Sequence, residues 1–282
     1  MIAPPDFDWG ISSLGCHELD LESVCRLADR NDIHFLEIRS LEDCLDLPGY
    51  LDRTFGEPSK IQSVLDRYNQ KIIALNSGFS LTEHTEEARK DLLLFAKWAD
   101  ALNIPYIRIF GGGTMSEPLS VEGLHTAVDT LNWWQDLRAQ NEWTTNLALE
   151  THDGFSSGKR CRQLQDAVGF MPPIIWDTHH TWKAGCESAE ETWRQIGPHI
   201  KHVHIKDSIS VPSARHPYTY VLPGQGEFPA RETLALLQEN GYAGVVSLEW
   251  ERKWHPYLPD LDTALNALET SGWRVSRRLV SA

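Results

Sequence analysis

Short apolar runs rich in β-branched residues alternate along the chain with longer stretches in which apolar residues recur at helical spacing. Runs of the first kind predict buried strands, and apolar residues at every third or fourth position predict amphipathic helices. The helical pattern is clearest at 21–31, 86–103 and 232–242, where Gly241 is expected to end the helix, and a last helix is expected near 259–274. The strand-like runs are WGISSLG (9–15), HFLEIR (34–39), KIIALNS (71–77), IPYIRIFGG (104–112), TNLALE (145–150), PIIWD (173–177), IKHVHIKD (200–207) and GVVSLEW (244–250).

The number of these units bears on the fold class. Eight strands with seven intervening helical stretches and a final helix, in 282 residues, favour a closed (β/α)8 TIM barrel of the α/β class. An open doubly wound sheet would be favoured by a GxGxxG turn after the first strand, and SSLGCHELD lacks that turn. No linker or low-complexity segment breaks the pattern, so we predict a single domain over residues 1–282. The polar stretch 208–229 is predicted to be a long loop that covers the site as a lid.

Charge and cysteine usage restrict the partners and the compartment. A formal net charge of −14 argues against nucleic acid as the main ligand, because neutralising phosphates requires clustered Lys and Arg. The five cysteines are odd in number and form no CxxC pair, which favours a reducing cytoplasm over a disulfide framework. The first residues, MIAPPDFDWG, carry no signal-peptide pattern, and no apolar run approaches the length of a membrane span. We therefore expect a soluble cytoplasmic protein with no nucleic-acid or membrane partner.

Four of the predicted strands end in a residue that can bind a metal ion. These residues are Glu150, Asp177, His204 and Glu249. The first three follow one another at intervals of 27 residues, and the interval of 45 to the fourth includes the long loop. One strand–helix unit therefore separates each residue from the next. Because inward-facing residues at the carboxyl ends of adjacent parallel strands converge on the barrel axis, we expect the four side chains to meet at one level.

Three carboxylates and an imidazole at one point require a cation, since their repulsion in a low-dielectric pocket would otherwise drive protonation. Taken singly, a glutamate at a strand end is more often a solvated or capping group, and the histidine of HVH is more often a core side chain. Four such residues in phase favour the ligand interpretation. Oxygen-rich sites suit Mn²⁺ or Mg²⁺, and one imidazole widens the choice to Co²⁺ or Zn²⁺. The sequence thus predicts one divalent metal ion, with Mn²⁺ as the first choice.

Five segments resemble signature blocks of the xylose isomerase-like TIM-barrel superfamily, the sugar phosphate isomerase/epimerase group. The segments are LALETHDG, IIWDTHHTWKAG, HVHIKDS, LPGQGEFP and VSLEWERKWHP. The resemblance covers most of the chain and is strongest from residue 104 to 256. It implies the same four metal ligands, around Mn²⁺, Co²⁺ or Mg²⁺. It also implies that His180, in the Asp-x-x-His of the sixth strand, contacts substrate, and that the protein forms a homo-oligomer, since barrels of this group are often dimers or tetramers.

Several further residues are candidate substrate contacts, each with a structural alternative. His180 lies one turn past Asp177. Lys206 alternates with His204 and so faces inward, either toward substrate or in an ion pair with Asp207. Arg108 is expected to pair with Glu150 or Glu37, and Glu251 shares the parity of Glu249. An aromatic wall for a sugar ring is a further possibility, although each member alone is more often core or rim packing; its residues are Trp9, Phe110, Trp182, Trp250 and Trp254. His216 and His255 are loop residues to which no role is assigned.

The ligand set favours an isomerase or epimerase that moves a proton next to the carbonyl of a keto-sugar or related polyol. A metal ion would acidify that proton, and Glu150 and Glu249, from opposite sides of the site, would serve as base and acid. Which of the two is the base stays open. No glycine-rich phosphate cradle or arginine cluster is visible in the sequence, which favours an unphosphorylated substrate.

Other functions are compatible with parts of the pattern. The alternative is a lyase on the same site, an inosose-type dehydratase or an enzyme that eliminates from a 3-oxo-glycoside. HVHIKD is closer to dehydratase patterns, whereas the epimerases tend to carry an arginine a few residues after that histidine, and Arg215 is eleven residues on. An apurinic-site endonuclease would need three zinc ions and histidines where NSG (76–78) and FGG (110–112) stand. A non-catalytic sugar-binding barrel would leave the metal ligands without a purpose.

Overall fold

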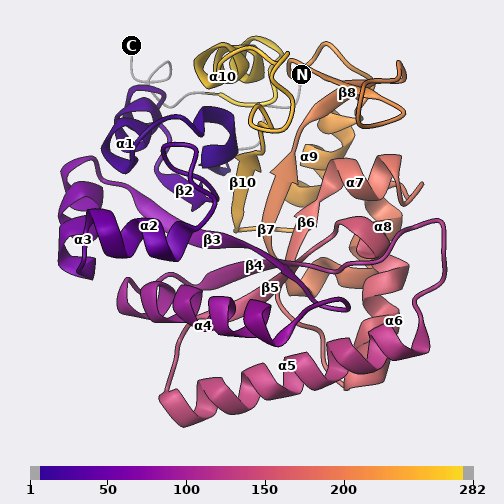
Figure 1. Cartoon of the computed structure of the whole chain (residues 1–282). Coiled ribbons are helices and arrows are strands. Elements are labelled where there is room, and N and C mark those ends of the chain that lie inside the picture. The colour runs from indigo at the N-terminus through magenta and orange to yellow at the C-terminus, as the bar shows by residue number, and fades with distance from the viewer. Residues whose placement is uncertain (1–6, 276–282) are drawn as a thin grey trace.

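The computed structural model describes residues 7–275, which form a closed barrel of eight parallel strands surrounded by helices (Figure 1). Around the barrel the strands follow the order β1-β10-β7-β6-β5-β4-β3-β2, and β2 pairs with β1 to close it. The predicted TIM-barrel fold is thereby confirmed. Of the domain predicted over residues 1–282, the first six and the last seven residues lie outside the described residues.

All eight strands fall within or close to the predicted runs. The strand β3 extends three residues further than expected, because the ladder shifts register after Asn76 and then pairs Ser80 with Phe110 of the next strand. The barrel strands are β1 (Asp8–Ser12), β2 (Phe35–Ile38), β3 (Lys71–Ser80), β4 (Tyr106–Phe110), β5 (Asn146–Glu150), β6 (Ile174–Asp177), β7 (Ile200–Ile205) and β10 (Val245–Leu248).

The helices form the outer layer, and two of the connections hold two helices where one stretch was predicted. These are the connections after β2 and after β6. The α-helices are α1 (Leu21–Arg30), α2 (Leu47–Thr54), α3 (Pro58–Arg67), α4 (Glu86–Ala101), α5 (Val121–Asn141), α6 (Gly158–Val168), α7 (Thr178–Lys183), α8 (Ala189–Ile196), α9 (Ala230–Glu239) and α10 (Leu261–Thr270). Short 3-10 turns lie at η1 (Ser13–Cys16), η2 (Asp153–Phe155) and η3 (Gly197–His199).

Side-chain caps and apolar faces explain where the helices begin and how they pack. In α1 the Asp20 carboxylate accepts from the backbone N–H of Ser23, and the apolar side chains predicted for its inner face are buried. In α8 Ser188 and Glu191 form a capping box. The helix α9 ends at Glu239, and Gly241 then takes a φ of 66°, which confirms the predicted stop. None of the helices between residues 7 and 275 combines the length and apolar character that a membrane crossing needs.

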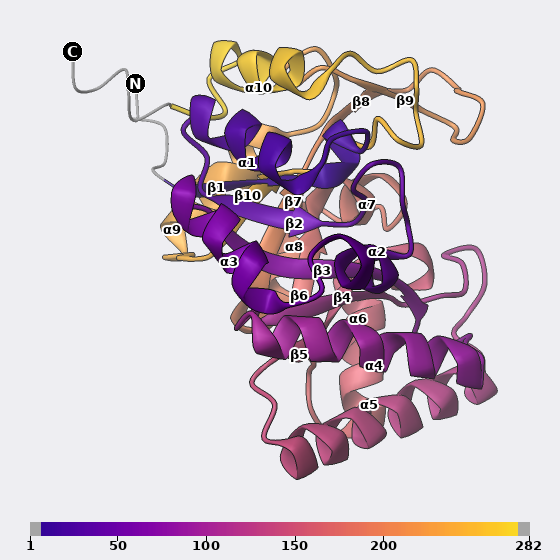
Figure 2. The same cartoon turned by 60° about the vertical axis from the view of Figure 1, so that its left-hand side comes forward.

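The long seventh loop contains a small antiparallel hairpin that the sequence analysis did not predict. Its strands are β8 (Asp207–Ile209) and β9 (Thr219–Val221), and it lies at the same end of the molecule as α7 (Figure 2). The carboxylate of Asp207 accepts four backbone N–H groups of the loop, from Ser208, Gly224, Gly226 and Phe228, at 2.9–3.1 Å. One side chain therefore fixes both ends of the loop.

Polar side chains point toward the barrel axis, whereas apolar side chains fill the layer between the strands and the helices. Alternation along a strand sends neighbouring residues to opposite faces. On β7 the apolar Val203 and Ile205 face the helices, and His202 and His204 face inward, where both contact Glu37 of β2. The side chains of these three polar residues are at most 2% exposed. Buried charges of this kind persist only when they are paired, so the interior is a network of ion pairs and hydrogen bonds.

Candidate metal centre

The structure brings together the four residues predicted to bind a metal ion. Glu150 ends β5, Asp177 ends β6, His204 lies on β7 and Glu249 follows β10. Each offers one donor atom, and these four atoms all lie within 4.8 Å of one another. All four side chains are buried. A single ion placed among them would be held by three carboxylates and one imidazole.

Strand register explains how residues from four strands meet. Asp177 is paired with His204, and Ser247, two residues before Glu249, is paired with the same histidine. Glu150 is paired with Ile175, two residues before Asp177. Successive candidate ligands are thus either level or offset by two residues, an even number that keeps every side chain on the inner face. The stagger itself is what closure of a barrel requires.

Asp177 has a second task, as the N-cap of helix α7. Its Oδ1 accepts a hydrogen bond of 2.8 Å from the backbone N–H of His180, three residues on. This bond fixes the carboxylate and leaves Oδ2 inside the cluster, 2.7 Å from Nζ of Lys206 and 3.3 Å from Nδ1 of His180. The Asp-x-x-His spacing therefore orients the carboxylate and brings the histidine ring beside it.

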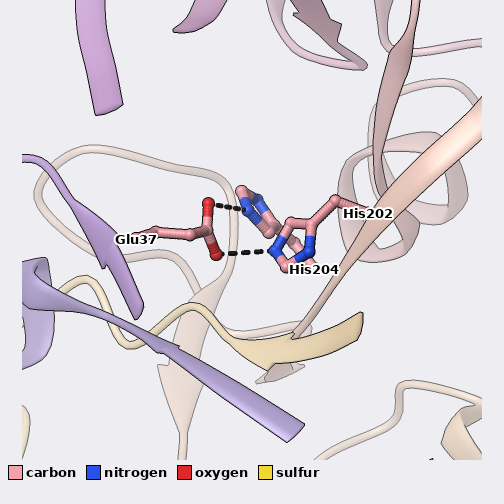
Figure 3. Close-up of side chains that lie close together, drawn as sticks. All are labelled: Glu37, His202 and His204. Atoms are coloured by element: carbon pink, nitrogen blue, oxygen red, sulfur yellow. Dashed lines mark hydrogen bonds and ion pairs between the residues drawn. The ribbon is translucent and has the colours of Figure 1, made fainter. Parts of the chain in front are cut away.

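The ring of His204 has carboxylates on both sides, and Figure 3 shows the one on the Glu37 side. Its Nδ1 lies 3.1 Å from Glu150 and 3.4 Å from Glu249, while its Nε2 lies 2.8 Å from Oε2 of Glu37. The other oxygen of Glu37 lies 2.7 Å from Nε2 of His202. Because an ionised carboxylate only accepts, both rings donate from Nε2, and Nδ1 of His204 is the nitrogen that can face a metal ion. Sequence reasoning considered Glu37 only as a partner of Arg108 and missed this role.

Lys206 lies among the carboxylates of the cluster. Its Nζ is 2.5 Å from Glu249 and from Glu251, besides its contact with Asp177. The expected alternative, an ion pair with the adjacent Asp207, was wrong, because the carboxylate of Asp207 turns the other way to hold the long loop. Burial disfavours the charged lysine, but Asp177, Glu249 and Glu251 outweigh it and raise the pKa of Lys206 well above its ordinary value.

The acidic residues of the cluster differ in their proton affinity. Burial works against ionisation of Glu249, but His204 and Lys206 hold its pKa well below the usual range. Burial and Glu249 also oppose ionisation of Glu150, yet Arg108 and His204 lower its pKa. Burial, opposed by Lys206 and reinforced by Glu249 and Glu150, raises the pKa of Asp177 to about 7. The carboxylates of the cluster therefore repel one another, and the nearby cations do not fully offset this repulsion at Asp177.

Two observations show that the cluster fits a divalent cation. Glu150 Oε2 is buried and accepts no hydrogen bond from the described residues; Arg108 Nε lies 3.4 Å from it, whereas Asp177 Oδ2 is already paired with Lys206 Nζ at 2.7 Å. A buried carboxylate oxygen without a hydrogen bond is rare in protein interiors and indicates an ion or another absent partner. The donor set, oxygen-rich with one imidazole, suits Mn²⁺, Mg²⁺, Co²⁺ or Zn²⁺.

A cavity of about 330 Å³ opens beside the cluster and is lined by Glu150, Glu249 and Glu251. Of the other predicted contacts, Arg108 lines the cavity, with its Nε 3.4 Å from Glu150 and no ion pair with Glu37. Lys206 and His180 lie behind the lining, in contact with Asp177. The ring of Trp182 packs on His179 and Phe228, outside the cavity.

The predicted aromatic wall is only partly assembled. Phe110 and Trp254 line the cavity, whereas Trp9 and Trp250 are buried in the core. Sequence reasoning missed further lining residues, most of them in loops or at strand ends whose partners lie far away in the chain; they are Arg39, His152, Arg215, His216 and His255. Arg215 bears on the choice between epimerase and lyase. It lies eleven residues after His204 in the sequence, but it is part of the long loop and lines the cavity. Its distance in sequence is therefore no argument against an epimerase.

The chain belongs to the xylose isomerase-like TIM barrel family, whose model matches residues 28–272. Among curated proteins it is similar to an inosose isomerase from Halalkalibacterium halodurans, with 25% identity over 264 residues that cover 88% of this chain and 89% of that protein. An uncharacterized protein of Mycobacterium tuberculosis is 34% identical over 73 residues, so this chain spans only about a quarter (24%) of that relative's length.

Solved structures share the fold at lower identity. A crystal structure of the IolI protein with a bound zinc atom has a TM-score of 0.74 and 19% identity, and the match covers 96% of this chain and 99% of that one. The probable 3-DHS dehydratase AsbF from Bacillus anthracis has a TM-score of 0.73 and 16% identity over 98% of this chain and 99% of that one. At these identities the two structures bear on the fold of this chain alone.

Proposed function

We propose that the protein is a divalent-metal-dependent isomerase or epimerase that transfers a proton next to the carbonyl of a keto-sugar or related polyol. The observation that supports this most strongly is the convergence of Glu150, Asp177, His204 and Glu249 within 4.8 Å at the edge of a cavity. The similarity to an inosose isomerase agrees with this class of reaction.

In this proposal Glu150, Asp177, His204 and Glu249 hold the ion, which when bound would polarise the substrate's carbonyl and so acidify the neighbouring C–H. Glu150 and Glu249 both line the cavity and would take the proton from one face of the substrate and return it to the other. Arg108 and His204 keep Glu150 ionised, and His204 and Lys206 do the same for Glu249, so both can accept a proton at neutral pH.

The test is solvent exchange in a metal-depleted and reloaded enzyme. The protein is stripped with a chelator, reloaded with Mn²⁺, Mg²⁺, Co²⁺ or Zn²⁺, and incubated in D₂O with a panel of ketoses and cyclic polyol ketones. We expect deuterium next to the carbonyl, detected by NMR, only in the reloaded samples. Glu150→Gln and Glu249→Gln should each lower exchange by at least 100-fold, because removing a proton-transfer group typically costs that much.

A result against the proposal would be a protein that binds no divalent ion in stoichiometric amount and exchanges no proton of any ketone. Glu227→Gln is the matched control variant, since that carboxylate lies in the long loop, bonded to Ser210, and does not line the cavity. It should exchange protons at the rate of the unaltered protein.

A lyase on the same site is the second candidate, and the position of Lys206 favours it. Its ammonium group contacts Asp177, Glu249 and Glu251, and Glu249 is one of the two proposed proton-transfer groups. In the elimination, a glutamate takes the proton next to the carbonyl, the C–O bond at the β carbon breaks, and the leaving oxygen takes a proton from Lys206. The products are an enone and water or an alcohol.

Lys206→Gln separates the two candidates. If the enzyme is a lyase, the wild type forms an enone that absorbs in the ultraviolet, and the variant loses enone formation by at least 100-fold. Deuterium exchange should fall by a much smaller factor, which reflects the help that Lys206 gives in keeping Glu249 ionised. If it is an isomerase, no enone appears with either protein, and mass spectrometry shows product of unchanged mass. Enone formation undiminished by the substitution would remove Lys206 as the proton donor.

A further inference from the structure

The cavity is lined by charged groups of both signs. Its carboxylates are those of Glu150, Glu249 and Glu251, and its guanidinium groups are those of Arg39, Arg108 and Arg215. These arginines come from the end of β2, from β4 and from the long loop, so no arginine cluster is visible in the sequence. The chain as a whole has a net charge of −14, so the grouping of three arginines in one cavity differs from its generally acidic character.

Arg108 is buried deep in this cavity and incompletely bonded. Its side chain is 1% exposed and its guanidinium lies over the ring of Phe110, 3.9 Å from the centroid. Its one ion-pair partner among the described residues is Glu150, at 3.4 Å, and neither Nε nor Nη1 donates a hydrogen bond. A buried guanidinium with open donors is costly unless a ligand completes its bonding.

Arg39 adds a second cation that no carboxylate neutralises. Among residues 7–275 no acidic oxygen lies within 4.0 Å of its guanidinium, and the one hydrogen bond of this group with those residues runs to the backbone oxygen of Leu45 at 3.4 Å. Burial and the charge of Arg108 lower the pKa of Arg39 to about 10, so it stays charged at neutral pH while its neighbour repels it. Arg39 also borders a second hollow beside α2 and α4, yet its electrostatic neighbour is Arg108.

We propose that Arg39 and Arg108 form an oxyanion subsite, so that the substrate carries a carboxylate or phosphate group in addition to the carbonyl that reacts. This deepens the proposed function and rests on it for the reaction, but the binding of the anion is independent of catalysis. A planar or tetrahedral oxyanion between the two guanidinium groups relieves their repulsion and accepts the donors that are open. The carboxylates Glu249 and Glu251, which also line the cavity, repel an anion and so favour the arginines as its binding site.

The proposal also accounts for the layout of the site. Arg108 contacts Glu150 directly and lies on β4, and Arg39 directly follows β2; these two strands flank β3. A substrate anchored by its anionic end would present its polar carbon chain to the carboxylates Glu150 and Glu249. Anchoring at a group that does not react fixes the orientation of the group that does.

The test compares three compounds that differ at one carbon: D-fructose, D-fructuronate and D-fructose 6-phosphate. Dissociation constants are measured by calorimetry with the Mn²⁺-loaded protein. We expect at least one of the two anionic compounds to bind at least tenfold more tightly than fructose, because charged hydrogen bonds typically contribute that much. Preference for fructuronate would identify a carboxylate subsite, and preference for the phosphate ester a phosphate subsite.

Arg39→Gln should bring the ratio of affinities for the anionic and the neutral compound close to one, and Arg39→Lys should give an intermediate ratio. Arg194→Gln removes the same charge from the exposed surface of α8 and should leave the ratio unchanged. Melting temperature and Mn²⁺ affinity are measured for each variant, so that a folding defect or a lost metal site is recognised separately.

Two results would overturn the proposal. The first is that neither anionic compound binds better than fructose, including the case in which none of the three binds at millimolar concentration. The second is a preference that persists in Arg39→Gln, because the anion would then be held by the metal ion or by another group. Failure of the exchange experiment would refute the proposed reaction, yet leave these affinities and their dependence on Arg39 as they stand.

Discussion

Glu37 shows how one residue can control a site that it does not enter. Its two oxygens each accept a hydrogen bond from an imidazole, at 2.7 and 2.8 Å, and the side chain of Asn76 adds a weaker donor at 3.2 Å. Burial opposes ionisation, but His202 and His204 lower the pKa of Glu37 well below its usual range. The carboxylate therefore keeps a negative charge that fixes the orientation of His204.

Glu37→Gln should weaken metal binding by about 10- to 100-fold, the usual cost of losing a hydrogen-bond partner behind a metal ligand. A glutamine has one acceptor oxygen, so only one of the two imidazoles keeps its partner. The dissociation constant for Mn²⁺ measures the effect, and ¹⁵N NMR of the histidine rings reports which nitrogen of His204 carries the proton.

Glu42→Gln serves as the control for this variant. Glu42 bonds the hydroxyl of Tyr50 and does not line the cavity, so its loss should leave metal affinity unchanged. Equal Mn²⁺ affinity in Glu37→Gln and in the unaltered protein would mean that His204 is oriented by its neighbours on the barrel wall instead.

At the residue scale, what could be predicted depended on position within a strand. Glu150, Asp177, His204 and Glu249 each stand at or near a strand end, so spacing alone indicated that they meet. Glu37 and Arg39 could not be assigned in this way. Glu37 contacts His204 of β7, and Arg39 lies near Arg108 of β4. Which inward-facing residues meet across a barrel depends on the stagger between its strands, and the sequence of a single strand does not reveal that stagger.

At the scale of elements, the long loop from β7 to α9 depends on Asp207. Asp207→Asn should release it, because an amide nitrogen in place of one oxygen would face two backbone N–H groups. We expect limited proteolysis between residues 208 and 229 to become at least tenfold faster, while the barrel keeps its circular dichroism spectrum. Cleavage at the rate of the unaltered protein would show that the hairpin of β8 and β9 keeps its conformation without the hydrogen bonds to Asp207.

The same loop shows where element prediction fails. Strands and helices of the barrel follow apolar periodicity, and all eight barrel strands were found where that periodicity placed them. The hairpin of β8 and β9 has strands of three residues each, too short for any period to be visible. Gly226 is required there for a steric reason, since a Cβ at that position would collide with the carboxylate of Asp207.

At the scale of the whole molecule, a metal ion should stabilise the fold. Repulsion among Glu150, Asp177 and Glu249 is present in the folded chain and absent from the unfolded one. At a free Mn²⁺ concentration 100 times the dissociation constant, binding adds about 2.7 kcal/mol to the free energy of unfolding, or about 5–10 °C in melting temperature. Differential scanning calorimetry with and without chelator measures it, and Glu150→Gln combined with Glu249→Gln should abolish it.

This stabilisation should grow as the pH rises. Below its pKa of about 7, Asp177 holds a proton that must leave before the carboxylate can bind a cation. His204 must lose a proton as well: burial disfavours its charged form, but Glu249 and Glu37 outweigh burial and raise the pKa of His204 well above its usual value. The Mn²⁺-dependent rise in melting temperature should therefore be larger at pH 8 than at pH 6. A rise of the same size at both values would mean that neither group is protonated in the metal-free protein.

The pairing of β1 with β10 ties the first strand of the chain to the last. Because Glu249 follows β10 directly, the fourth donor reaches its neighbours only when the circle of strands is complete. During synthesis a ribosome-bound chain that lacks β10 would hold Glu150, Asp177 and His204 on an open sheet, without the fourth partner. We therefore predict that the complete barrel binds the ion of the proposed function more tightly than a chain that lacks β10.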